Sequence, residues 1–484
     1  MTLTGTDLFA LLPVLLVLGT ALAVLVSVAV SRQHFVNATI TVVGLNAALV
    51  SLLLVVGATP VSVTDLVVID DYTVLYTALI LVASLACSTL AHAYLDGYPG
   101  RREEFYMLLL TAVAGGIILA ASQHLAALFI GLELLSVPLY GMAAYTYRDH
   151  RSLEAGLKYM VLSAAASAFL LFGMALLYAA TGTLQISELG AAIDDGVIHR
   201  SWLVIGSGMM VIAIAFKLSL VPFHLWTPDV YEGAPAPAAA FLATVGKVAV
   251  FAVLVRLFQS APATADAALH QMIAALALIS MIAGNLLALR QNNLKRLLGY
   301  SSIAHMGYIT VAIVATGSLA VEAAGMYLIT YVLATLGAFG VLTLVSSPYD
   351  GTDAGAVHNY RGLFWRRPYL AAVMTVMMLS LAGIPSTAGF IGKFYVIALG
   401  VQSELWWLVG GIVLGSAIGL YYYLRVMVVM YLFEPGERRR DAAHDWGQRS
   451  GGIMVLLIAL AVMGIGLFPQ PLILLVEAAG LGSG

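Results

Sequence analysis

The chain has 484 residues, of which 61% are hydrophobic and 10% are charged. Its mean hydropathy of +0.98 is far above that of soluble domains and predicts a polytopic membrane protein. The formal net charge of -3 is small, and no basic tail suggests nucleic-acid binding. The one cysteine, Cys87, lies inside an apolar run, which excludes a disulfide framework and a cysteine-ligated metal or iron–sulfur site. We therefore expect no redox centre in this chain.

Fourteen apolar runs are long enough to cross a bilayer, which takes about 20 residues each. The first run, after Asp7, lacks the positive flank and cleavage site of a signal peptide, so we expect a retained helix. The short turn near Ser122 and His124 is the weakest boundary. The sequence predicts an all-α membrane protein with about 14 transmembrane helices. The runs cover residues 8–30, 36–57, 72–94, 104–121, 124–146, 155–180, 201–221, 235–258, 270–289, 299–316, 322–345, 369–400, 406–432 and 452–476.

Loops on alternate sides of the predicted membrane differ in charge. One set is rich in arginine, whereas the other is mostly acidic, with Arg200 and Arg256 as its cations. By the positive-inside rule the arginine-rich loops are cytoplasmic, so both termini are predicted on the opposite side. The arginine-rich set holds Arg32, Arg101, Arg102, Arg148, Arg151, Arg290, Lys295, Arg296, Arg361, Arg366, Arg367, Arg438, Arg439, Arg440 and Arg449.

Lysine is placed differently from arginine. Four of the five lysines, Lys158, Lys217, Lys247 and Lys393, fall in apolar runs. Arginine stays charged in proteins, whereas a desolvated lysine can lose its proton, so lysine suits a site that must be neutral for part of a cycle. Glu133 is the one acid near the middle of an apolar run, and we expect it to be the counter-charge. Ionisable residues inside a membrane usually mark ion or proton pathways, so the sequence predicts such a pathway.

Two of the runs are interrupted. The stretch FKLSLVPFHLWTPDVYEGAPAPAAAFLATVGK, residues 216–247, places prolines soon after Lys217. The 32-residue run 369–400 is too long for one span and contains glycines and a proline just before Lys393. Broken backbone at this depth persists only where it is buried in protein or faces a wet cavity. These features favour two broken helices beside an ion pathway.

The two predicted breaks lie five spans apart, in the seventh and twelfth runs. Spans 4–8 and 9–13 are therefore predicted to be five-helix repeats, and an odd number of spans gives them opposite orientations in the membrane. We expect four units: an N-terminal three-helix segment (1–100), a first antiporter-like repeat (101–260), a second, inverted repeat (261–433), and a C-terminal loop with the last helix (434–484).

Several candidates also have purely structural explanations. The buried charges could form static ion pairs, and Lys158, one turn into its run, could snorkel to the surface. His224 and His305 suit a proton relay because histidine titrates near neutral pH, but each could equally be a satisfied core histidine. Asp229 and Glu232 fit a helix cap or an entrance charge better than a metal site, because no other ligand spacing accompanies them. Two aromatic clusters fit packing and an interfacial belt rather than a cofactor site: Trp406 and Trp407, and Tyr421, Tyr422 and Tyr423.

Three stretches carry a family resemblance: residues 216–247, QNNLKRLLGYSSIAHMGYI and LAGIPSTAGFIGKFYV. They resemble the antiporter-like subunit N of the bacterial proton-pumping NADH:quinone oxidoreductase, respiratory complex I, and the resemblance covers nearly the whole chain. The motif PDVYEGAP distinguishes subunit N from the related subunits M and L and from the multi-subunit sodium/proton antiporters. Lys393 also matches subunits N and L, whereas subunit M is expected to carry glutamate there.

The resemblance implies a proton channel made of two half-channels that a polar axis joins at mid-membrane depth. In this family Glu133 and Lys217 would form the ion pair of the first half, with Lys158 as an associated lysine. Lys247 would connect the two halves, and Lys393 would belong to the exit half. The chain would thus be a proton-translocating subunit of an NADH:quinone oxidoreductase, with electron transfer from NADH to quinone as the energy source.

The resemblance also implies roles outside the lysines. His224 and His305 would be relay residues of the polar axis. NADH, FMN, iron–sulfur clusters and quinone are expected on partner subunits, and the expected partners are membrane-arm subunits of the K, M, L, J, A and H types. The implied location is the bacterial inner membrane, with both termini periplasmic.

Two other functions stay open from the sequence. The first is an Mrp-like cation/proton antiporter subunit without redox coupling. The second is a structural membrane subunit in which the lysines are locked in ion pairs. Association with an NADH-oxidising complex would separate the first from subunit N, and neutral replacements that leave proton transfer intact would favour the second.

Overall fold

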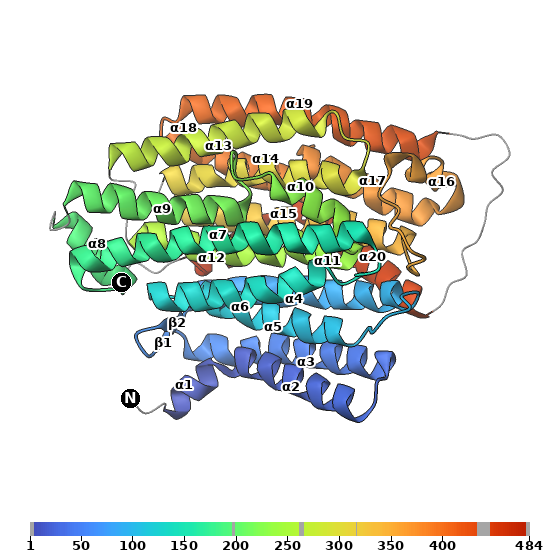
Figure 1. The fold of residues 1–484 in the computed structure, drawn as a ribbon. Coiled ribbons are helices and arrows are strands. Elements are labelled where there is room, and N and C mark those ends of the chain that lie inside the picture. The colour runs from blue at the N-terminus through green and yellow to red at the C-terminus, as the bar shows by residue number, and fades with distance from the viewer. Residues whose placement is uncertain (1–3, 196–198, 261–265, 316, 433–445, 481–484) are drawn as a thin grey trace.

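The protein is a bundle of long helices that run side by side across the view in Figure 1. The computed structural model describes residues 4–195, 199–260, 266–315, 317–432 and 446–480. Within these ranges, 13 helices are long and apolar enough to cross a membrane. The run predicted over 369–400 forms two shorter apolar helices instead. The predicted all-α membrane architecture is confirmed.

The N-terminal segment packs along one side of the bundle. A two-stranded antiparallel hairpin, with Val61 paired to Ile69, precedes the third span. We name the end of the bundle that carries this hairpin the hairpin end; both chain termini lie there in Figure 1. We name the opposite end, which carries the turn at 31–33, the arginine-rich end. The elements are α1 Gly5–Ala10, α2 Leu12–Val30, α3 His34–Val55, the 3-10 helix η1 Val56–Ala58, β1 Val61–Val63, β2 Val67–Ile69 and α4 Asp71–Leu95.

The next five spans form the first group. The break predicted after Lys217 is confirmed, because α9 ends at Leu218 and α10 begins at Trp226. A further interruption at Thr244, which divides the eighth span into α11 and α12, was not predicted. The elements are α5 Glu104–Ala121, α6 Leu125–Ala143, α7 His150–Thr181, α8 Ile186–Asp194, α9 Arg200–Leu218, α10 Trp226–Gly233, α11 Ala236–Ala243 and α12 Val245–Ser260.

The second group of five spans repeats this order of helices. Its third member is long, as in the first group, with 28 residues in α15 and 32 in α7. Its fourth member is broken, and the break lies between Gly383 and Thr387, as predicted. The elements are α13 Ala267–Ala288, α14 Leu294–Ala315, α15 Ser318–Val345, the 3-10 helix η3 Val357–Tyr360, α16 Leu363–Arg366, α17 Pro368–Ala382, α18 Ala388–Gln402 and α19 Trp406–Tyr431.

The last predicted span requires a correction. A single helix over 452–476 is wrong, because α20 (Trp446–Leu467) stops before Pro469 and the short α21 (Gln470–Ala478) follows. Proline has no amide hydrogen and disfavours a helical residue before it, which explains the interruption.

Two candidate residues, Lys247 and His305, lie on the most buried spans. The apolar window of the span made by α11 and α12 is 100% buried and that of α14 is 94% buried, against 28% for α2. The spans α2, α19 and α20 therefore form the rim, and their apolar outer faces suit lipid or a neighbouring membrane subunit. The centre of the bundle consists of helices from both groups.

Candidate functional site

Lys217 lies in the last turn of α9, where the first broken helix stops. The helix ends because Ser219 adopts a φ of +65°, in the left-handed region. The Lys217 residue is only 6% exposed. Its Nζ donates hydrogen bonds to the Oγ atoms of Ser136 on α6 and Ser163 on α7, both at 2.6 Å. Neutral hydroxyls therefore hold this ammonium group.

The predicted ion pair between Glu133 and Lys217 is absent from this conformation. Glu133 is half-buried, and its Oε1 accepts a hydrogen bond from Ser167 at 2.5 Å. Ser163 and Ser167 are one turn apart on α7 and therefore share a face of that helix. The carboxylate and the ammonium are thus each bound to a serine of α7 instead of to each other.

Lys247 reaches the same break from the following span. Its Nζ donates to the carbonyl oxygen of Lys217 at 2.9 Å and to the Oγ of Ser219 at 2.5 Å, and it lies 5.1 Å from the centre of the Trp226 ring. The last carbonyls of a helix have no partner within the helix, and the negative end of the helix dipole favours a cation. Lys247 meets both conditions at the end of α9.

A small cavity is lined by both of these lysines. Its volume is about 10 Å³, which is close to the space that one water molecule needs. The stacked rings of Tyr159 and Trp226, 4.6 Å apart, form part of its wall. The other lining residues are Leu135, Ser136, Leu139, Leu242, Gly246 and Val250. A water at this place would lie beside both ammonium groups.

Lys393 occupies the corresponding position at the second break. It is 7% exposed, and its Nζ donates to the carbonyl oxygens of Leu381 and Ala382, at 3.0 and 2.9 Å, at the end of α17. Gly383 terminates α17 with a φ of +82°, and a Cβ there would lie 2.7 Å from Cδ of Lys393. The lysine therefore requires a glycine at this turn, both for the backbone angle and for space.

His305 lies on α14 and is 4% exposed. Its Nδ1 is 2.7 Å from the hydroxyl of Tyr327, and its Nε2 is 3.2 Å from the hydroxyl of Tyr423. The adjacent Tyr308 ring lies 5.6 Å from the histidine ring and 5.5 Å from Nζ of Lys393. The predicted relay histidine is thus joined by tyrosines to the surroundings of Lys393.

These tyrosines are the main feature that the sequence prediction missed. An interfacial belt does not describe Tyr422 and Tyr423, because both are packed inside the bundle at 1% exposed, and Tyr423 also contacts His305. Tyr331 donates to the carbonyl of Ala243, beside the interruption at Thr244. The tyrosines therefore extend the polar contacts from the neighbourhood of Lys247 to the second break.

The structure does not join His224 to these contacts. The residue lies in the first break and is 7% exposed. Neither ring nitrogen makes a hydrogen bond of normal geometry to any of the described residues. Its position beside the break agrees with the prediction, whereas a direct contact with a lysine is not formed in this conformation.

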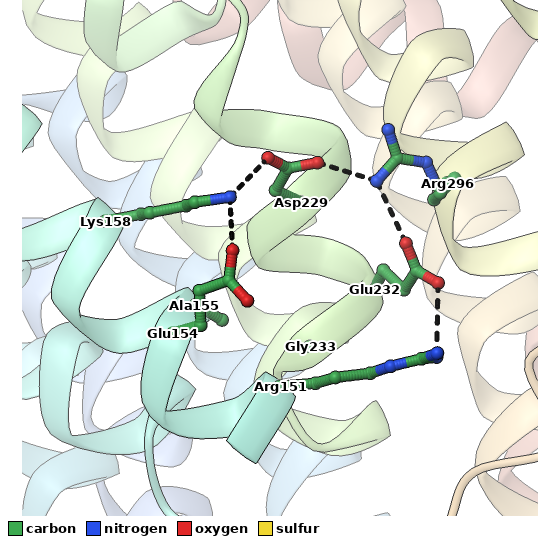
Figure 2. Close-up of a pocket in the computed structure, with 8 residues that line it drawn as sticks. All are labelled: Arg151, Glu154, Ala155, Lys158, Asp229, Glu232, Gly233 and Arg296. Atoms are coloured by element: carbon green, nitrogen blue, oxygen red, sulfur yellow. Dashed lines mark hydrogen bonds and ion pairs between the residues drawn. The ribbon is translucent and has the colours of Figure 1, made fainter. Parts of the chain in front are cut away.

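Lys158 lies apart from Lys217, Lys247 and Lys393. Its side chain is 41% exposed and pairs with Glu154 at 2.5 Å and with Asp229 at 2.9 Å. It lines a cavity of about 240 Å³ at the arginine-rich end of α7 and α10 (Figure 2). Of the two explanations left open for Lys158, a position toward the surface describes it. Asp229 and Glu232 also line this cavity, and neither caps a helix.

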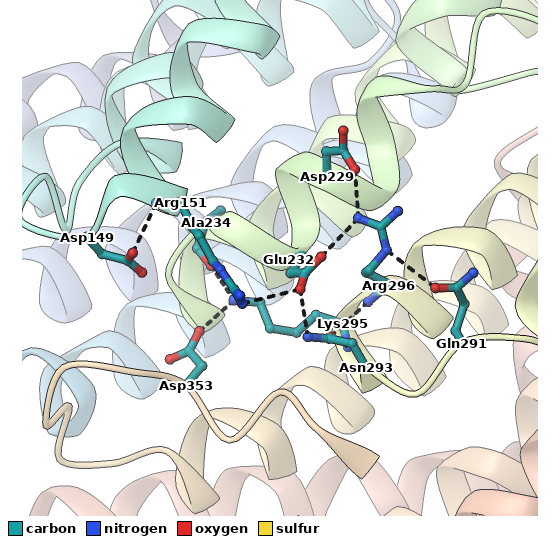
Figure 3. A network of polar contacts seen from close by, with 10 residues as sticks. All are labelled: Asp149, Arg151, Asp229, Glu232, Ala234, Gln291, Asn293, Lys295, Arg296 and Asp353. Atoms are coloured by element: carbon teal, nitrogen blue, oxygen red, sulfur yellow. Dashed lines mark hydrogen bonds and ion pairs between the residues drawn. The ribbon is translucent and has the colours of Figure 1, made fainter.

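Ion pairs join this cavity to the second group of spans (Figure 3). Nη1 of Arg296, on α14, binds Asp229 at 2.6 Å and Glu232 at 2.9 Å. Lys295, which the sequence suggested to be a loop charge, is 2% exposed. Its Nζ donates to the carbonyl of Ala234 at 2.5 Å and to Asp353 at 2.6 Å. Lys295 and Arg296 thus link the end of α10 to the start of α14, the helix that carries His305.

Comparison with known proteins covers up to 99% of the chain. The family model described as "NADH:quinone oxidoreductase/Mrp antiporter, TM" matches residues 122–419. The chain is 62% identical, over 99% of its length and 97% of the relative, to NADH-quinone oxidoreductase subunit N of Ectopseudomonas mendocina (strain ymp). It is 63% identical, over 97% of its length and 98% of the relative, to the subunit N of Chromohalobacter salexigens.

Three solved membrane complexes contain a similar chain. One is respiratory complex I from Thermus thermophilus, with a TM-score of 0.82 and 35% identity over 97% of this chain and 100% of that chain. The archaeal membrane-bound sulfane sulfur reductase gives a TM-score of 0.86 and 25% identity over 98% and 97% of the two chains. The Mrp complex from Dietzia sp. DQ12-45-1b shares the fold, with a TM-score of 0.84 and 20% identity over 99% and 97%. Sequence identity is 62–63% to the two subunit N chains but only 20–35% to the chains in these three solved complexes. The chain therefore belongs to the subunit N family of NADH-quinone oxidoreductase.

Proposed function

We propose that this chain translocates protons across the membrane as a subunit of NADH:quinone oxidoreductase, through a buried axis of lysine, histidine and tyrosine. The observation that carries the proposal is the burial of Lys217, Lys247, His305 and Lys393 inside the bundle, each less than 10% exposed. Such groups are costly inside a membrane, and they usually mark proton or ion routes. Electron transfer from NADH to quinone in the assembled enzyme supplies the energy.

The residues divide into an entrance, a centre and an exit. Glu133, Lys217 and the serines of α7 form the first half, and Lys247 connects it with the second. His305 relays the proton, with its tyrosine neighbours, to Lys393 in the exit half. His224 lies in the first break beside this route. Lys158 and the cavity that it lines form the surface entrance to the first half, which places the entrance at the arginine-rich end.

Proton loading follows from the charges. When the Glu133 carboxylate approaches Lys217, it stabilises the ammonium form, and when it withdraws, the proton is released toward Lys247. At an effective dielectric constant of about 20, a pair at 4 Å is worth about 4 kcal/mol, which is a change of about a thousandfold in proton affinity. The observed serine contacts correspond to the separated arrangement of this pair.

The topology and the assembly are part of the same proposal. Spans 4–8 and 9–13 act as inverted repeats, within units 101–260 and 261–433, and both termini are periplasmic because the arginine-rich end is cytoplasmic. The partners are membrane-arm subunits of the K, M, L, J, A and H types in the bacterial inner membrane. NADH, FMN, the iron–sulfur clusters and quinone bind to partner subunits.

The test is NADH-driven proton pumping by the whole complex in inverted membrane vesicles, at matched complex content. We expect Lys217→Ala to lower both pumping and NADH-driven quinone reduction by at least about tenfold, which is less than the roughly 10²–10⁴-fold that a positioned proton-transfer group typically contributes. Arg101→Ala removes a charge whose side chain is 75% exposed, far from the axis, and serves as the control with normal pumping.

A second variant separates the channel from a structural ion-pair subunit. Lys217→Arg keeps the positive charge but cannot release its proton. The channel requires this variant to assemble and to lose pumping. Normal pumping in Lys217→Arg or Lys217→Ala would contradict the proposed function, because a charge that only holds helices together never has to give up its proton.

A further inference from the structure

Two arginines outside the lysine axis occupy nearly the same position in the two groups of spans. Arg256 lies near the end of the fifth span of the first group, on α12. Arg425 lies near the end of the fifth span of the second group, on α19. The first is at the hairpin end, and the second is at the arginine-rich end. The proton route described above uses neither of them.

Arg256 is buried at the hairpin end, with 4% of the residue exposed. Its Nη1 and Nη2 bind the two carboxylate oxygens of Asp70, each at 2.9 Å, and Nη2 also binds the hydroxyl of Thr73 at 3.0 Å. The guanidinium lies 4.9 Å from the centre of the Tyr72 ring. Asp70, with a side chain that is 22% exposed, is the more accessible partner, so the positive end of this pair faces the interior of the bundle.

The same helix carries Lys247 toward the membrane centre. Nine positions separate Lys247 from Arg256, or about 13.5 Å along an α-helix. The intervening residues, 248–255, have the sequence VAVFAVLV, and all of them are buried. A proton that left Lys247 directly toward the hairpin end along this helix would therefore have to cross an apolar segment and then a fixed cation.

Arg425 has the corresponding relation to the second group. It is half-buried and donates hydrogen bonds to the carbonyl oxygens of Leu289, at 3.2 Å, and Gln291, just beyond the end of α13. It lies two residues after Tyr423, whose hydroxyl contacts His305, so its side chain leaves α19 on nearly the opposite face. Along the axis of α19, Arg425 stands on the arginine-rich side of Tyr423.

We propose that Arg256 and Arg425 are electrostatic barriers, each of which closes one half of the proton route on the side away from its opening. Arginine stays charged in proteins, and a fixed arginine in a narrow membrane passage repels protons. Arg256 keeps a proton on Lys247 from leaking to the hairpin end, and Arg425 keeps a proton near His305 from returning to the arginine-rich end. This inference rests on the proposed function, because it assigns the direction of that route.

The experiment measures passive proton flux in sealed inverted vesicles that contain the complex, without NADH, after an imposed pH difference. We expect Arg256→Gln and Arg425→Gln to raise the flux by about tenfold, which corresponds to about 1.4 kcal/mol in barrier height. Arg256→Lys keeps the charge and should stay as tight as the wild type. Arg449→Gln removes an exposed charge at the start of α20 and is the matched control.

Asp70→Asn makes the test independent of whether the glutamine variants fold. This change removes the carboxylate but leaves the barrier cation, so the flux should equal that of the wild type or be lower. A structural ion pair predicts the opposite, a leak as large as in Arg256→Gln. A tight Arg256→Gln complex, a leaky Arg256→Lys complex or a leaky Asp70→Asn complex would each overturn the proposal. Because no substrate is present, these results are separate from the pumping test of Lys217.

Discussion

At each helix break, carbonyl oxygens at the end of the first helix accept hydrogen bonds from a lysine, and the lysine comes from a different place in the chain at each break. At the first break, the open carbonyl of Lys217 accepts a hydrogen bond from Lys247, which belongs to the next span. At the second break, the open carbonyls of Leu381 and Ala382 accept bonds from Lys393, on the second piece of the same broken helix. In both places an ammonium group occupies the negative end of a helix that stops inside the bundle.

The surroundings of the two breaks differ in their acids. At the first break an acid lies near the lysine: Ser167 binds Glu133 and Ser163 binds Lys217. These two serines are one turn apart on α7. The second break has main-chain carbonyls and the Tyr308 ring around Lys393, and no ion pair involving it is found among the described residues. A movable carboxylate can change the charge state at the first break, whereas the fixed dipole of α17 sets it at the second. The first break is therefore suited to accept a driving signal, and the second to pass a proton on.

The largest expected effect comes from removal of the second lysine. Lys393→Ala leaves the carbonyls of α17 without their donor and the route without its last buried base. We expect NADH-driven pumping to fall by at least about tenfold at matched complex content. Substitution at Tyr369, on the outer part of α17, by Phe provides the control. Pumping at the wild-type level in Lys393→Ala would show that the two breaks are not functionally equivalent.

The turns that end the two helices provide the next comparison. Gly383→Ala places a side chain at a φ of +82° and against Lys393, which should destabilise the protein by about 1–3 kcal/mol. Ser219→Gly relaxes the left-handed backbone at the first break but removes the hydroxyl that accepts a hydrogen bond from Lys247, so any loss of stability there comes from that bond and not from strain. Thermal unfolding of the purified complex, followed by the loss of assembled membrane arm, compares the two. Equal melting temperatures for Gly383→Ala and the wild type would contradict the packing described for the second break.

The two serines of α7 that bind Glu133 and Lys217 distinguish the first break. Replacement of both Ser163 and Ser167 by alanine removes a partner from Lys217 and from Glu133. Hydrogen bonds to charged groups contribute about 1.5–3 kcal/mol, and direct contact of the two charges can offset much of that loss. We expect pumping to fall several-fold without loss of assembly. Ser201→Ala, at the exposed start of α9, is the control, and an unchanged rate in the double variant would remove the serines from the route.

The smallest effect is the acid dependence of the Asp70–Arg256 pair. Among the residues that the structure describes, no carboxylate forms a corresponding pair with Arg425, which binds main-chain carbonyls. Burial tends to raise the pKa of Asp70, but the Arg256 guanidinium and the hydrogen bonds from Thr73 together outweigh burial and lower that pKa below its ordinary value. The stabilisation is therefore present above the unfolded pKa of about 3.9 and is lost as the pH falls through the folded pKa. The melting temperature of Asp70→Asn should lie below that of the wild type at pH 6, and the gap should shrink below pH 4. A gap that is constant with pH would contradict this pairing.

The sequence predicts those features that follow from hydropathy, proline and glycine. The spans, the two breaks and the burial of Lys217, Lys247 and Lys393 follow from such patterns, and the resemblance to subunit N is confirmed by the relatives. The separation of Glu133 from Lys217 was not predictable, because it depends on which serines of α7 face each charge. Nor was the interruption at Thr244, which no proline or glycine at that position announces.

Contacts between distant spans were the least visible from the sequence. Tyr423 looks like a belt residue because a run of aromatic residues near the end of a span is typical of the membrane interface. Only the packing of α19 against α14 turns it toward His305. Lys295 looks like a loop charge for a similar reason, since it begins a span, and its burial depends on Asp353, which lies far away in the chain.

The bond from Lys247 to the main chain of Lys217 makes two proton sites share one peptide group. Any shift of the end of α9 that follows a change of charge on Lys217 also moves the acceptor that holds Lys247. Linkage requires this influence to be mutual: if an occupied Lys217 weakens proton binding at Lys247 by some factor, an occupied Lys247 weakens it at Lys217 by the same factor. If both lysines carry the proposed protons, this coupling disfavours two protons on the pair at once, and transfer of a proton from Lys217 to Lys247 prepares Lys217 to bind the next one only after Lys247 has released its own.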